Sequence, residues 1–288
     1  MFFTQKEDRM NKYMNDIIDV LKVDYDIDAS NFDDSFLTRI IDMRIRDTKS
    51  ESYNEYKHII KENIHETIVL KKLLNITYTR FFRDSLKFAQ LQKIVIPNLV
   101  TMINKQRELR IWSAASSSGE EAYSLAILIS EFEEELGIEI PYRIIATDIS
   151  EAKLEKGRRG VFRKNEIIDL KLKYIEKYFT NRGSEYVISE KLKRNISFSY
   201  FDLIDDRNIK PPESIYGDFD LVLCNNLLFY YNLEVQRKII AKSELSLAPN
   251  GYFITSETEK ILVKDFTKLK QINPNSSIFK LKNQGGKV

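Results

Sequence analysis

The chain has 288 residues, of which 43% are hydrophobic and 31% are charged, and its formal net charge is +2. This balance is typical of a globular protein with a substantial core, and it excludes a disordered chain. The charges form no dense basic stripe, so we expect no nucleic-acid partner.

Cysteine and histidine usage narrows the chemistry further. Cys224 is the only cysteine, and His58 and His65 are the only histidines. No intrachain disulfide can form, which favours a reducing compartment. The histidines lack cysteines or acids at ligand spacing, so we expect no metal. The first ten residues do not form a signal peptide and no segment is long enough to span a bilayer, so we expect a cytoplasmic protein without membrane insertion.

Residues 4–73 are predicted to be helical. Apolar residues recur there at helical spacing in three stretches, which polar turns at residues 28–34 and 48–53 separate. On the second stretch, Arg39 and Arg46 lie seven residues apart. Their acidic neighbours favour a solvated face, and a docking surface for an acidic partner helix is the alternative.

Residues 76–84, ITYTRFFRD, interrupt the helical pattern. A buried Phe81–Phe82 pair would anchor Arg83 so that its guanidinium points into a cleft. Helical spacing then resumes at Phe88 and ends at Pro97.

The stretch Leu109–Ser124, LRIWSAASSSGEEAYS, is the most informative part of the chain. An apolar strand pattern leads into a run of small residues and Gly119, and Glu120 and Glu121 then open a helix. Backbone can approach a ligand closely at such a turn. The acids would repel a pyrophosphate, so a cationic ligand with a ribose, such as S-adenosylmethionine, fits better. An ordinary strand-to-helix turn with a favourable acidic first turn is the alternative.

Strands and helices alternate after this stretch. A strand predicted at residues 142–147 ends in Asp148, where sheets of this kind bind ribose hydroxyls. A plain helix N-cap at Asp148, in place of Ser150, is the alternative. Residues 160–194 are predicted to be an insertion with a helix and a small hairpin. Further strands are predicted at residues 196–201, 219–224, 252–256 and 278–282, the last at a sheet edge, with a helix from Leu233 to about Leu247 that ends at Pro249.

Six separate motifs, in order and at sensible intervals, carry a resemblance to a known family. They are Thr79-x-Phe81-Phe82-Arg83; Trp112-Ser-Ala-Ala with Ser118-Gly-Glu-Glu-x-Tyr-Ser124; Ala146-Thr-Asp148-Ile; Leu154-Glu-Lys with Gly160-Val; Tyr178-Phe179; and Phe219-Asp-Leu through Cys224-x-Asn226 to Tyr230. Over essentially its whole length, the sequence resembles the chemotaxis receptor methyltransferases, the CheR family.

The resemblance implies an α/β fold: a doubly wound S-adenosylmethionine-dependent methyltransferase sheet, an N-terminal all-helical domain and a small inserted β-subdomain. On this chain the helical domain would be residues 1–75, and residues 76–108 would add a linker and a helix to the cofactor cleft. The methyltransferase domain would be residues 109–288, with the β-subdomain at about 160–194.

The resemblance also implies an activity. The family transfers the methyl group of S-adenosylmethionine to glutamate side chains of chemoreceptors, which forms γ-methyl esters in chemotaxis adaptation and leaves S-adenosylhomocysteine. No metal is implied. The implied partner is the cytoplasmic helical region of the receptors, and binding of a receptor C-terminal tail through the β-subdomain is left open.

Site residues follow from the matched motifs. Arg83 and Tyr230 take the catalytic roles. The cofactor contacts fall on Thr77, Thr79, Arg83, Glu120, Asp148, Asp202, Leu203, Asn225 and Asn226.

The chain departs from the family at four positions. The family commonly has Asn where Thr77 and Asp202 stand, Arg where Asn225 stands and Pro where Ala122 stands. Without the arginine the cleft loses a positive charge, which would weaken binding or shift substrate preference.

The chemistry of a glutamate acceptor suits these residues. The carboxylate is already an anion at neutral pH, so no strong base is needed, consistent with the absence of histidine after His65. Arg83 and Tyr230 would align the acceptor, while Glu120 and Asp148 would hold polar groups of the cofactor. The alternatives are a methyltransferase of the same fold that acts on another protein substrate, and a non-catalytic cofactor-binding or receptor-binding adaptor.

Overall fold

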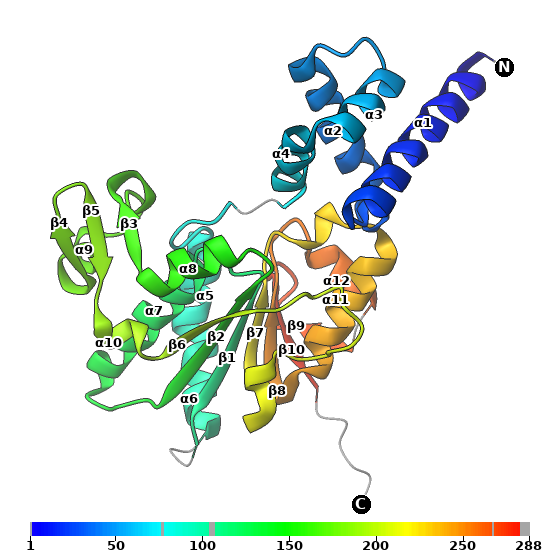
Figure 1. Ribbon diagram of the computed structural model, residues 1–288. Coiled ribbons are helices and arrows are strands. Elements are labelled where there is room, and N and C mark those ends of the chain that lie inside the picture. The colour runs from blue at the N-terminus through cyan, green and yellow to red at the C-terminus, as the bar shows by residue number, and fades with distance from the viewer. Residues whose placement is uncertain (1, 76–77, 104–106, 267, 283–288) are drawn as a thin grey trace, which may run out of the picture. The chain divides into compact units, whose positions relative to one another are not determined.

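The computed structural model describes residues 2–75, 78–103, 107–266 and 268–282 (Figure 1). Two units, each with its own hydrophobic core, divide the chain between them. The first unit comprises Met1–Ile76 and Phe229–Gln236, and the second comprises Thr77–Leu228 and Arg237–Val288. Within the described residues, no helix is long and apolar enough to cross a membrane.

The first unit is helical, as the apolar spacing predicts. Its helices are α1 Phe2–Tyr25, α2 Asp34–Thr48, α3 Tyr53–Glu62 and α4 Ile64–Leu74, with a 3-10 turn at Ala29–Asn31. The carboxylate of Asp33 accepts hydrogen bonds from the first N–H groups of α2, and Ser52 caps α3 in the same way. These caps lie inside the two predicted turns.

A buried ion pair joins two helices of this unit. Arg44 on α2 donates to both oxygens of Glu66 on α4, at 2.8 and 2.7 Å, and Tyr56 on α3 donates to the same carboxylate. Glu66 is only 6% exposed. Part of the basic run on α2 therefore serves the packing of the unit.

The stretch Phe229–Gln236 packs on α2 and the turn before it. The rings of Phe32 and Tyr231 stack at 5.3 Å, and the ring of Tyr230 contacts that of Phe36 edge-on at 5.0 Å. The carbonyl of Tyr230 accepts the N–H of Asp33 at 2.9 Å. The helical unit therefore fixes the backbone at Tyr230.

The second unit is built on a seven-stranded sheet in the order β6-β2-β1-β7-β8-β10-β9. The strands are β1 Leu109–Ala114, β2 Tyr142–Asp148, β6 Ile196–Tyr200, β7 Phe219–Cys224, β8 Leu247–Ile254, β9 Leu269–Gln271 and β10 Ile278–Leu281. The first five strands in this order pair in parallel, and β10 runs antiparallel to both its neighbours. Every residue of β1 and β7 is buried, as expected for a sheet covered on both faces. The predicted doubly wound α/β sheet is confirmed.

Helices connect and cover these strands. They are α5 Ser85–Gln90, a π-helical turn at Leu91–Val95, α6 Ile96–Ile103, α7 Glu120–Leu136, α8 Glu151–Arg159, α11 Leu233–Leu245 and α12 Lys260–Phe266, with 3-10 turns at Lys164–Glu166, Pro212–Tyr216 and Leu228–Tyr230. The chain runs from β1 outward through β2 to β6 and then returns to β7 on the other side of β1. Open sheets bind ligands at the carboxyl ends of the strands where the order reverses, which here is between β1 and β7.

A separate three-stranded antiparallel sheet, in the order β3-β5-β4, forms the predicted insertion. It contains β3 Val161–Arg163, β4 Phe179–Arg182 and β5 Glu185–Ile188, together with α9 Leu172–Tyr178 and α10 Glu190–Lys193. Figure 1 shows it beyond the β6 edge of the large sheet. The predicted order of a helix followed by a hairpin is confirmed.

Three predicted boundaries were wrong. Pro97 does not end a helix: the helical backbone continues from α5 through the π-helical turn Leu91–Val95 into α6, and Pro97 is the second residue of α6. Strand β8 begins at Leu247, so Pro249 lies inside it; its pairing with β7 shifts register there, between Phe219 and Leu221. Strand β10 is not at the edge, because the short β9 lies outside it.

The Arg44–Glu66 pair gives a stability prediction. Arg44→Met leaves a buried carboxylate without its cation, so the free energy of opening of the α2 and α4 amides should fall by about 3–5 kcal/mol. Native-state hydrogen exchange on the full chain measures it. Arg46→Met, an exposed change on the same helix, is the control. Equal effects of the two variants would contradict the importance of the pair.

Candidate active site

The turn between β1 and α7 has an unusual backbone. Ala115, Ser117 and Gly119 all adopt left-handed conformations, with φ of 54°, 51° and 85°. The N–H of Ser116 donates to Thr147 at the end of β2, and the N–H of Gly119 donates back to Ser116. Such a backbone is most strained for β-branched and bulky residues, which is consistent with the run of small residues.

Gly119 has a second constraint besides its φ. A Cβ added there would lie 2.6 Å from ring atoms of Phe198 on β6, closer than packed atoms approach. The turn therefore lies against the adjacent strand, and only glycine fits at the N-cap of α7.

Asp148 ties the end of β2 to this turn. One carboxylate oxygen accepts the N–H of Ser117 at 2.8 Å, and the other accepts the N–H of Ser150 at 2.9 Å. Asp148 is 6% exposed, and burial raises the pKa of its carboxyl above the ordinary value, although these N–H groups act in the opposite direction. Ser150 is the N-cap residue of α8 by position, but its side chain makes no capping bond.

Glu120 is the second buried acid of the turn. Both of its oxygens accept the hydroxyl of Ser118 at 2.9 Å, and the amine of Lys156 lies 3.9 Å away. Burial raises the pKa of Glu120. Among the described residues, Lys156 is the one cation within 4.0 Å of Glu120, and it is beyond hydrogen-bond distance. A ligand that brings positive charge or hydroxyl donors would therefore be favourable here.

These residues fit the cofactor that the sequence predicts. A ribose offers hydroxyls to a carboxylate such as Asp148, and an ammonium group or sulfonium suits Glu120. The hydroxyl of Ser116 in the same turn is buried and has no hydrogen-bond partner among the described residues. Such a hydroxyl is available to a ligand that binds at this turn.

Four parallel strands bring the predicted site residues to one edge of the sheet. Ala114 pairs with Thr147 on one side and with Cys224 on the other, and Asp148 pairs with Tyr200. The residues that follow β1, β2, β6 and β7 therefore start at the same level. They include Glu120, Asp148, Asp202, Leu203, Asn225 and Asn226.

Asp202 and Leu203 follow β6. Asp202 is half-buried and accepts the N–H of Ile204 at 2.8 Å, while Leu203 is 6% exposed. The local hydrogen bond uses only one carboxylate oxygen, Oδ1. Their place at the sheet edge is compatible with the predicted cofactor contacts, which stay a prediction.

The loop after β7 is held more tightly than its sequence suggests. Asn225 donates to Glu121 at 2.5 Å and accepts from the amine of Lys87 at 2.8 Å. Asn226 has a left-handed backbone, with φ of 58°, and its N–H donates to Glu259 at 2.9 Å. The family's arginine is absent at Asn225, but the amine of Lys87 on α5 reaches this position.

Aromatic packing holds Phe81 and Phe82, but only Phe81 is buried and Phe82 is half-buried, so the predicted buried pair is confirmed in part. Phe81 is 1% exposed and contacts the rings of Phe162 and Phe179 in the inserted subdomain. Phe82 stacks on Tyr174 and has a left-handed backbone, with φ of 48°. A bulky residue in that conformation is strained, which is typical of functional sites.

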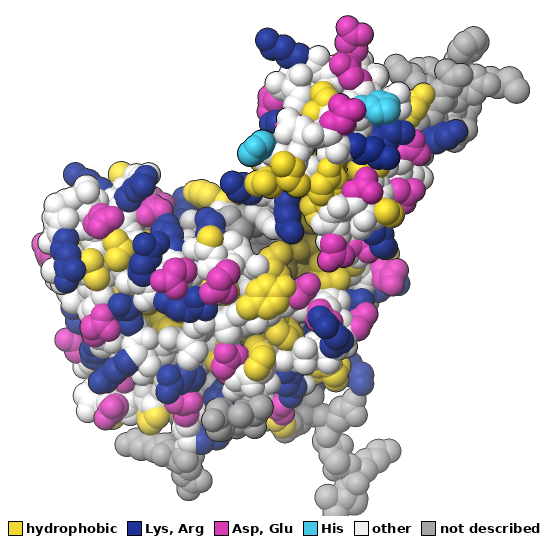
Figure 2. Space-filling model, in the orientation of Figure 1, with side chains coloured by type: hydrophobic (Ala, Val, Ile, Leu, Met, Phe, Trp, Pro, Cys, Tyr) yellow, Lys and Arg dark blue, Asp and Glu magenta, His cyan; other side chains and the backbone are white. Residues whose placement is uncertain are grey.

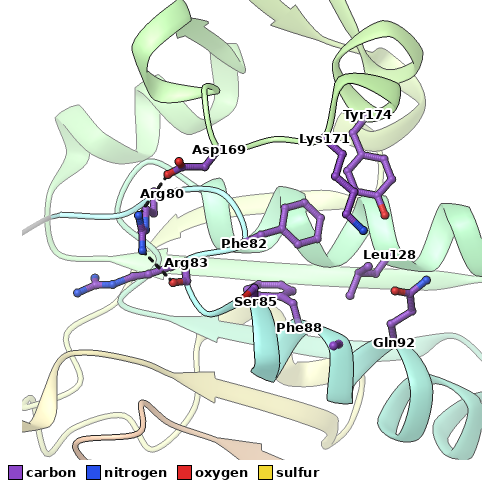
Figure 3. Close-up of a pocket in the computed structure, with 11 residues that line it drawn as sticks. Arg80, Phe82, Arg83, Ser85, Phe88, Gln92, Leu128, Asp169, Lys171 and Tyr174 are labelled. Carbon is purple, nitrogen blue, oxygen red and sulfur yellow. Dashed lines mark hydrogen bonds and ion pairs between the residues drawn. The ribbon is translucent and has the colours of Figure 1, made fainter.

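Arg83 follows this strained residue. Its guanidinium donates to the carbonyl of Tyr78 at 2.9 Å and lies over the Tyr78 ring. A pocket of about 330 Å³ lies around Phe82, Phe88 and Tyr174, and Arg83 is among the residues that line it. Figure 3 shows the end of the Arg83 side chain directed away from these rings.

The remaining predicted residues have different outcomes. Thr77 lies outside the described residues. Thr79 is half-buried in the segment before α5, and Tyr230 belongs to the first unit. The roles of all the predicted site residues stay predictions.

Two buried residues of this site were missed by sequence reasoning: Lys87 and Glu259, which are 5% and 0% exposed. Lys87 lies four residues after Arg83 and Glu259 lies three residues after Ser256. On a single sequence each looks like a solvated helix residue, because its partners are far away along the chain.

Other kinds of site find little support. Among the described residues, no group of three or more His, Cys, Asp and Glu side chains could hold a metal ion. On the face that Figure 2 shows, basic and acidic side chains of the second unit are interspersed. Cys224 is buried, and burial raises the pKa of its thiol, which disfavours a nucleophilic role.

Comparison with known proteins decides the family. A family model described as "CheR methyltransferase, SAM binding domain" matches residues 77–277. The chain belongs to the CheR methyltransferase family. The resemblance expected from the six motifs is confirmed, and the protein is an S-adenosylmethionine-dependent methyltransferase.

Named relatives agree with this assignment. A chemotaxis protein methyltransferase of Listeria monocytogenes is 30% identical over 84% of this chain and 88% of its own length. One from Borreliella burgdorferi is 30% identical over 73% of this chain and 75% of its own length. A 104.1 kDa protein of Rhodobacter capsulatus, described as uncharacterized, is 28% identical over 85% of this chain, which spans only 25% of that protein. The CheR unit thus also occurs within a much longer chain.

The Gly119 constraint gives a prediction on cofactor binding. Gly119→Ala should weaken S-adenosylhomocysteine binding about tenfold or more, because the added Cβ displaces Phe198 or the turn and strains the backbone by about 1–3 kcal/mol. Isothermal titration calorimetry measures the affinity.

Gly137→Ala is the matched control. Gly137 also has a left-handed backbone, at the other end of α7, but nothing lies within 4 Å of an added Cβ. It should keep the wild-type affinity, and an equal loss in both variants would mean that strain in the helix, not the turn, governs binding.

Proposed function

We propose that this protein transfers the methyl group of S-adenosylmethionine to glutamate side chains in the cytoplasmic helical region of chemoreceptors, which forms γ-methyl esters. The observation that carries the proposal is the pair of buried acids, Glu120 at the start of α7 and Asp148 at the end of β2, beside the left-handed turn that follows β1. They suit a cationic, ribose-bearing cofactor, and the names of the relatives point to chemotaxis.

The acceptor chemistry needs alignment more than proton transfer. The bound cofactor supplies an activated methyl group on a sulfonium. A glutamate carboxylate is already ionised at neutral pH, so the protein has no proton to remove. Holding two reactants in line is worth up to about 7–11 kcal/mol of the barrier.

Each side chain has a role in this proposal. Asp148 holds ribose hydroxyls, and Glu120 holds a cationic or hydroxyl group of the cofactor. Asp202, Leu203 and Asn226 line the rest of the cofactor, with Thr79 and Arg83 from the segment before α5. Arg83 and the hydroxyl of Tyr230 hold the acceptor carboxylate and offset part of its desolvation.

The proposed partner is a helical receptor region, with the helical first unit as its docking element. The cytoplasm is the proposed place of action, where a lone cysteine stays reduced. The β3-β5-β4 sheet would serve a receptor tail, since an edge strand such as β4 offers unpaired backbone groups. No metal enters the proposal.

The assay that tests the function follows labelled methyl from S-adenosylmethionine to a receptor cytoplasmic fragment. The label should appear on the receptor and be released by mild base, because carboxylate methyl esters hydrolyse readily. Base-stable label would replace the glutamate acceptor with nitrogen or sulfur. Tight cofactor binding without transfer to any receptor fragment would favour a non-catalytic adaptor.

Two substitutions should separate the roles. Tyr230→Phe should lower kcat about tenfold or more with cofactor affinity nearly unchanged, because it removes one hydrogen bond to a charged acceptor. Asp148→Ala should do the reverse and weaken cofactor binding by about 10–100-fold. Steady-state kinetics and calorimetry measure both.

Exposed residues provide the controls. Tyr13→Phe in the first unit and Glu151→Ala in the first turn of α8 remove the same groups from exposed positions, and both should behave as wild type. A large loss of cofactor affinity in Tyr230→Phe would contradict the assignment of Tyr230 to the acceptor.

A further inference from the structure

Lys87 is a buried cation that the proposed chemistry does not use. It stands in the first turn of α5, which Asp84 caps, and its side chain is 5% exposed. Its amine donates to Oδ1 of Asn225 at 2.8 Å and to the carbonyl of Thr255 at 3.5 Å. The carboxylate of Asp84 lies 4.0 Å away. Burying a lysine is costly, so these contacts need a reason.

Asn225 links Lys87 by hydrogen bonds to the start of α7 and to β1. Its amide nitrogen donates to Glu121 at 2.5 Å, and the other oxygen of Glu121 accepts the hydroxyl of Ser113 on β1 at 2.7 Å. One line of hydrogen bonds therefore runs from α5 through the end of β7 to α7 and β1. Glu121 directly follows Glu120, so the line reaches the residue next to a proposed cofactor contact.

Glu259 holds the same loop from its other side. It is fully buried, and its carboxylate accepts the N–H of Asn226 at 2.9 Å and that of Leu228 at 2.7 Å. The hydroxyl of Thr255 donates to Glu259 at 2.8 Å, while the carbonyl of Thr255 faces Lys87. The segment Asn225–Leu228 is thus held at its side chain by Lys87 and at its backbone by Glu259.

The loop held by Lys87 and Glu259 lies where ligands are expected to bind. It begins at the carboxyl end of β7, beside the turn that follows β1, where ligands bind in such sheets. Its Asn226 has a left-handed backbone, which is strained unless the surroundings fix it. The loop leads within two residues from Leu228 to Tyr230.

We propose that Lys87 is a positioning residue for methyl transfer, which fixes the Asn225–Leu228 loop through Asn225 and places a positive charge under the cofactor end of the sheet. The proposal rests on the proposed function, and deepens it. The cation comes from α5, which follows Arg83 directly, so one segment supplies both a residue that faces the reactants and the residue that supports the opposite loop.

The first test compares three lysine variants. Lys87→Met should lower kcat/KM for S-adenosylmethionine by about 100-fold, because a misplaced loop of about 1 Å costs that much. Lys87→Arg keeps the charge and should recover at least tenfold over Lys87→Met. Lys93→Met, the same change at an exposed position a few residues later, should behave as wild type. Wild-type kcat/KM in Lys87→Met would overturn the proposal, as would equal losses in the Met and Arg variants.

A pH profile separates positioning by charge from mere packing. Burial lowers the pKa of the Lys87 amine, and the charge of Arg83 lowers it further. The carboxylates of Glu121, Asp84 and Glu259 raise this pKa, but burial has the largest effect. As pH rises through this lowered pKa the amine becomes neutral and loses the charge that strengthens its hydrogen bond to Asn225. The alkaline limb of kcat/KM should therefore lie below the usual lysine value of 10.5 in wild type and move up in Lys87→Arg, because a guanidinium stays charged. Superimposable profiles would overturn the proposal.

The profile is measured as S-adenosylhomocysteine formed, since the ester product hydrolyses at high pH. A readout without activity makes the result independent of the acceptor. Hydrogen exchange of the Asn226 and Leu228 amides should become at least tenfold faster in Lys87→Met and not in Lys93→Met. Faster exchange in a protein that methylates no receptor would support Lys87 and reject the proposed acceptor. Unchanged exchange in Lys87→Met would reject Lys87 alone.

Discussion

The hydrogen bonds of the Asp148 carboxylate are the constraint on which the rest of the site depends. They tie the end of β2 to the N–H of Ser117 in a turn of left-handed residues. Without this hydrogen-bond partner, nothing would hold the turn in its strained left-handed conformation. Because the turn is fixed, Glu120 starts α7 as a buried acid, and the sheet edge presents two carboxylates whose pKa values burial raises.

Buried charged side chains also hold the loop at the end of β7, but there a lysine takes part as well as a carboxylate. The carboxylate of Glu259 accepts two backbone N–H groups there, as that of Asp148 does at the end of β2. The amine of Lys87 donates to Asn225 in the same loop. Both loops are thus held by buried charged side chains whose hydrogen bonds go to the backbone or to an amide. In the proposal, Glu259 and Glu121 only orient their neighbours, whereas Asp148 also accepts ribose hydroxyls. That distinction explains why Glu121, beside Glu120, contacts Ser113 and Asn225.

The sequence predicts those features that depend on neighbouring residues. The α/β sheet follows from alternating strands and helices, and Glu120 and Asp148 can be recognised because small residues and strand ends mark them. Lys87 and Glu259 are not visible, because Lys87 meets Asn225 across 138 positions of the chain and Glu259 meets Leu228 across 31. Pro97 and Pro249 were misleading because the backbone around each is irregular: a π-helical turn directly precedes Pro97, and the pairing of β8 with β7 shifts register near Pro249.

Tyr230 shows how the chain separates two tasks. In the second unit, the N–H of Leu228 donates to Glu259. In the first unit, the carbonyl of Tyr230 accepts the N–H of Asp33, and the ring of Tyr230 contacts that of Phe36. The residues proposed for the cofactor are fixed by the sheet and its buried charges, while the residue proposed for the acceptor is fixed by helical packing. Variation in the helical unit can therefore change the acceptor while the turn at Asp148 stays the same. This is the arrangement a methyltransferase needs when its cofactor is constant and its protein substrates differ.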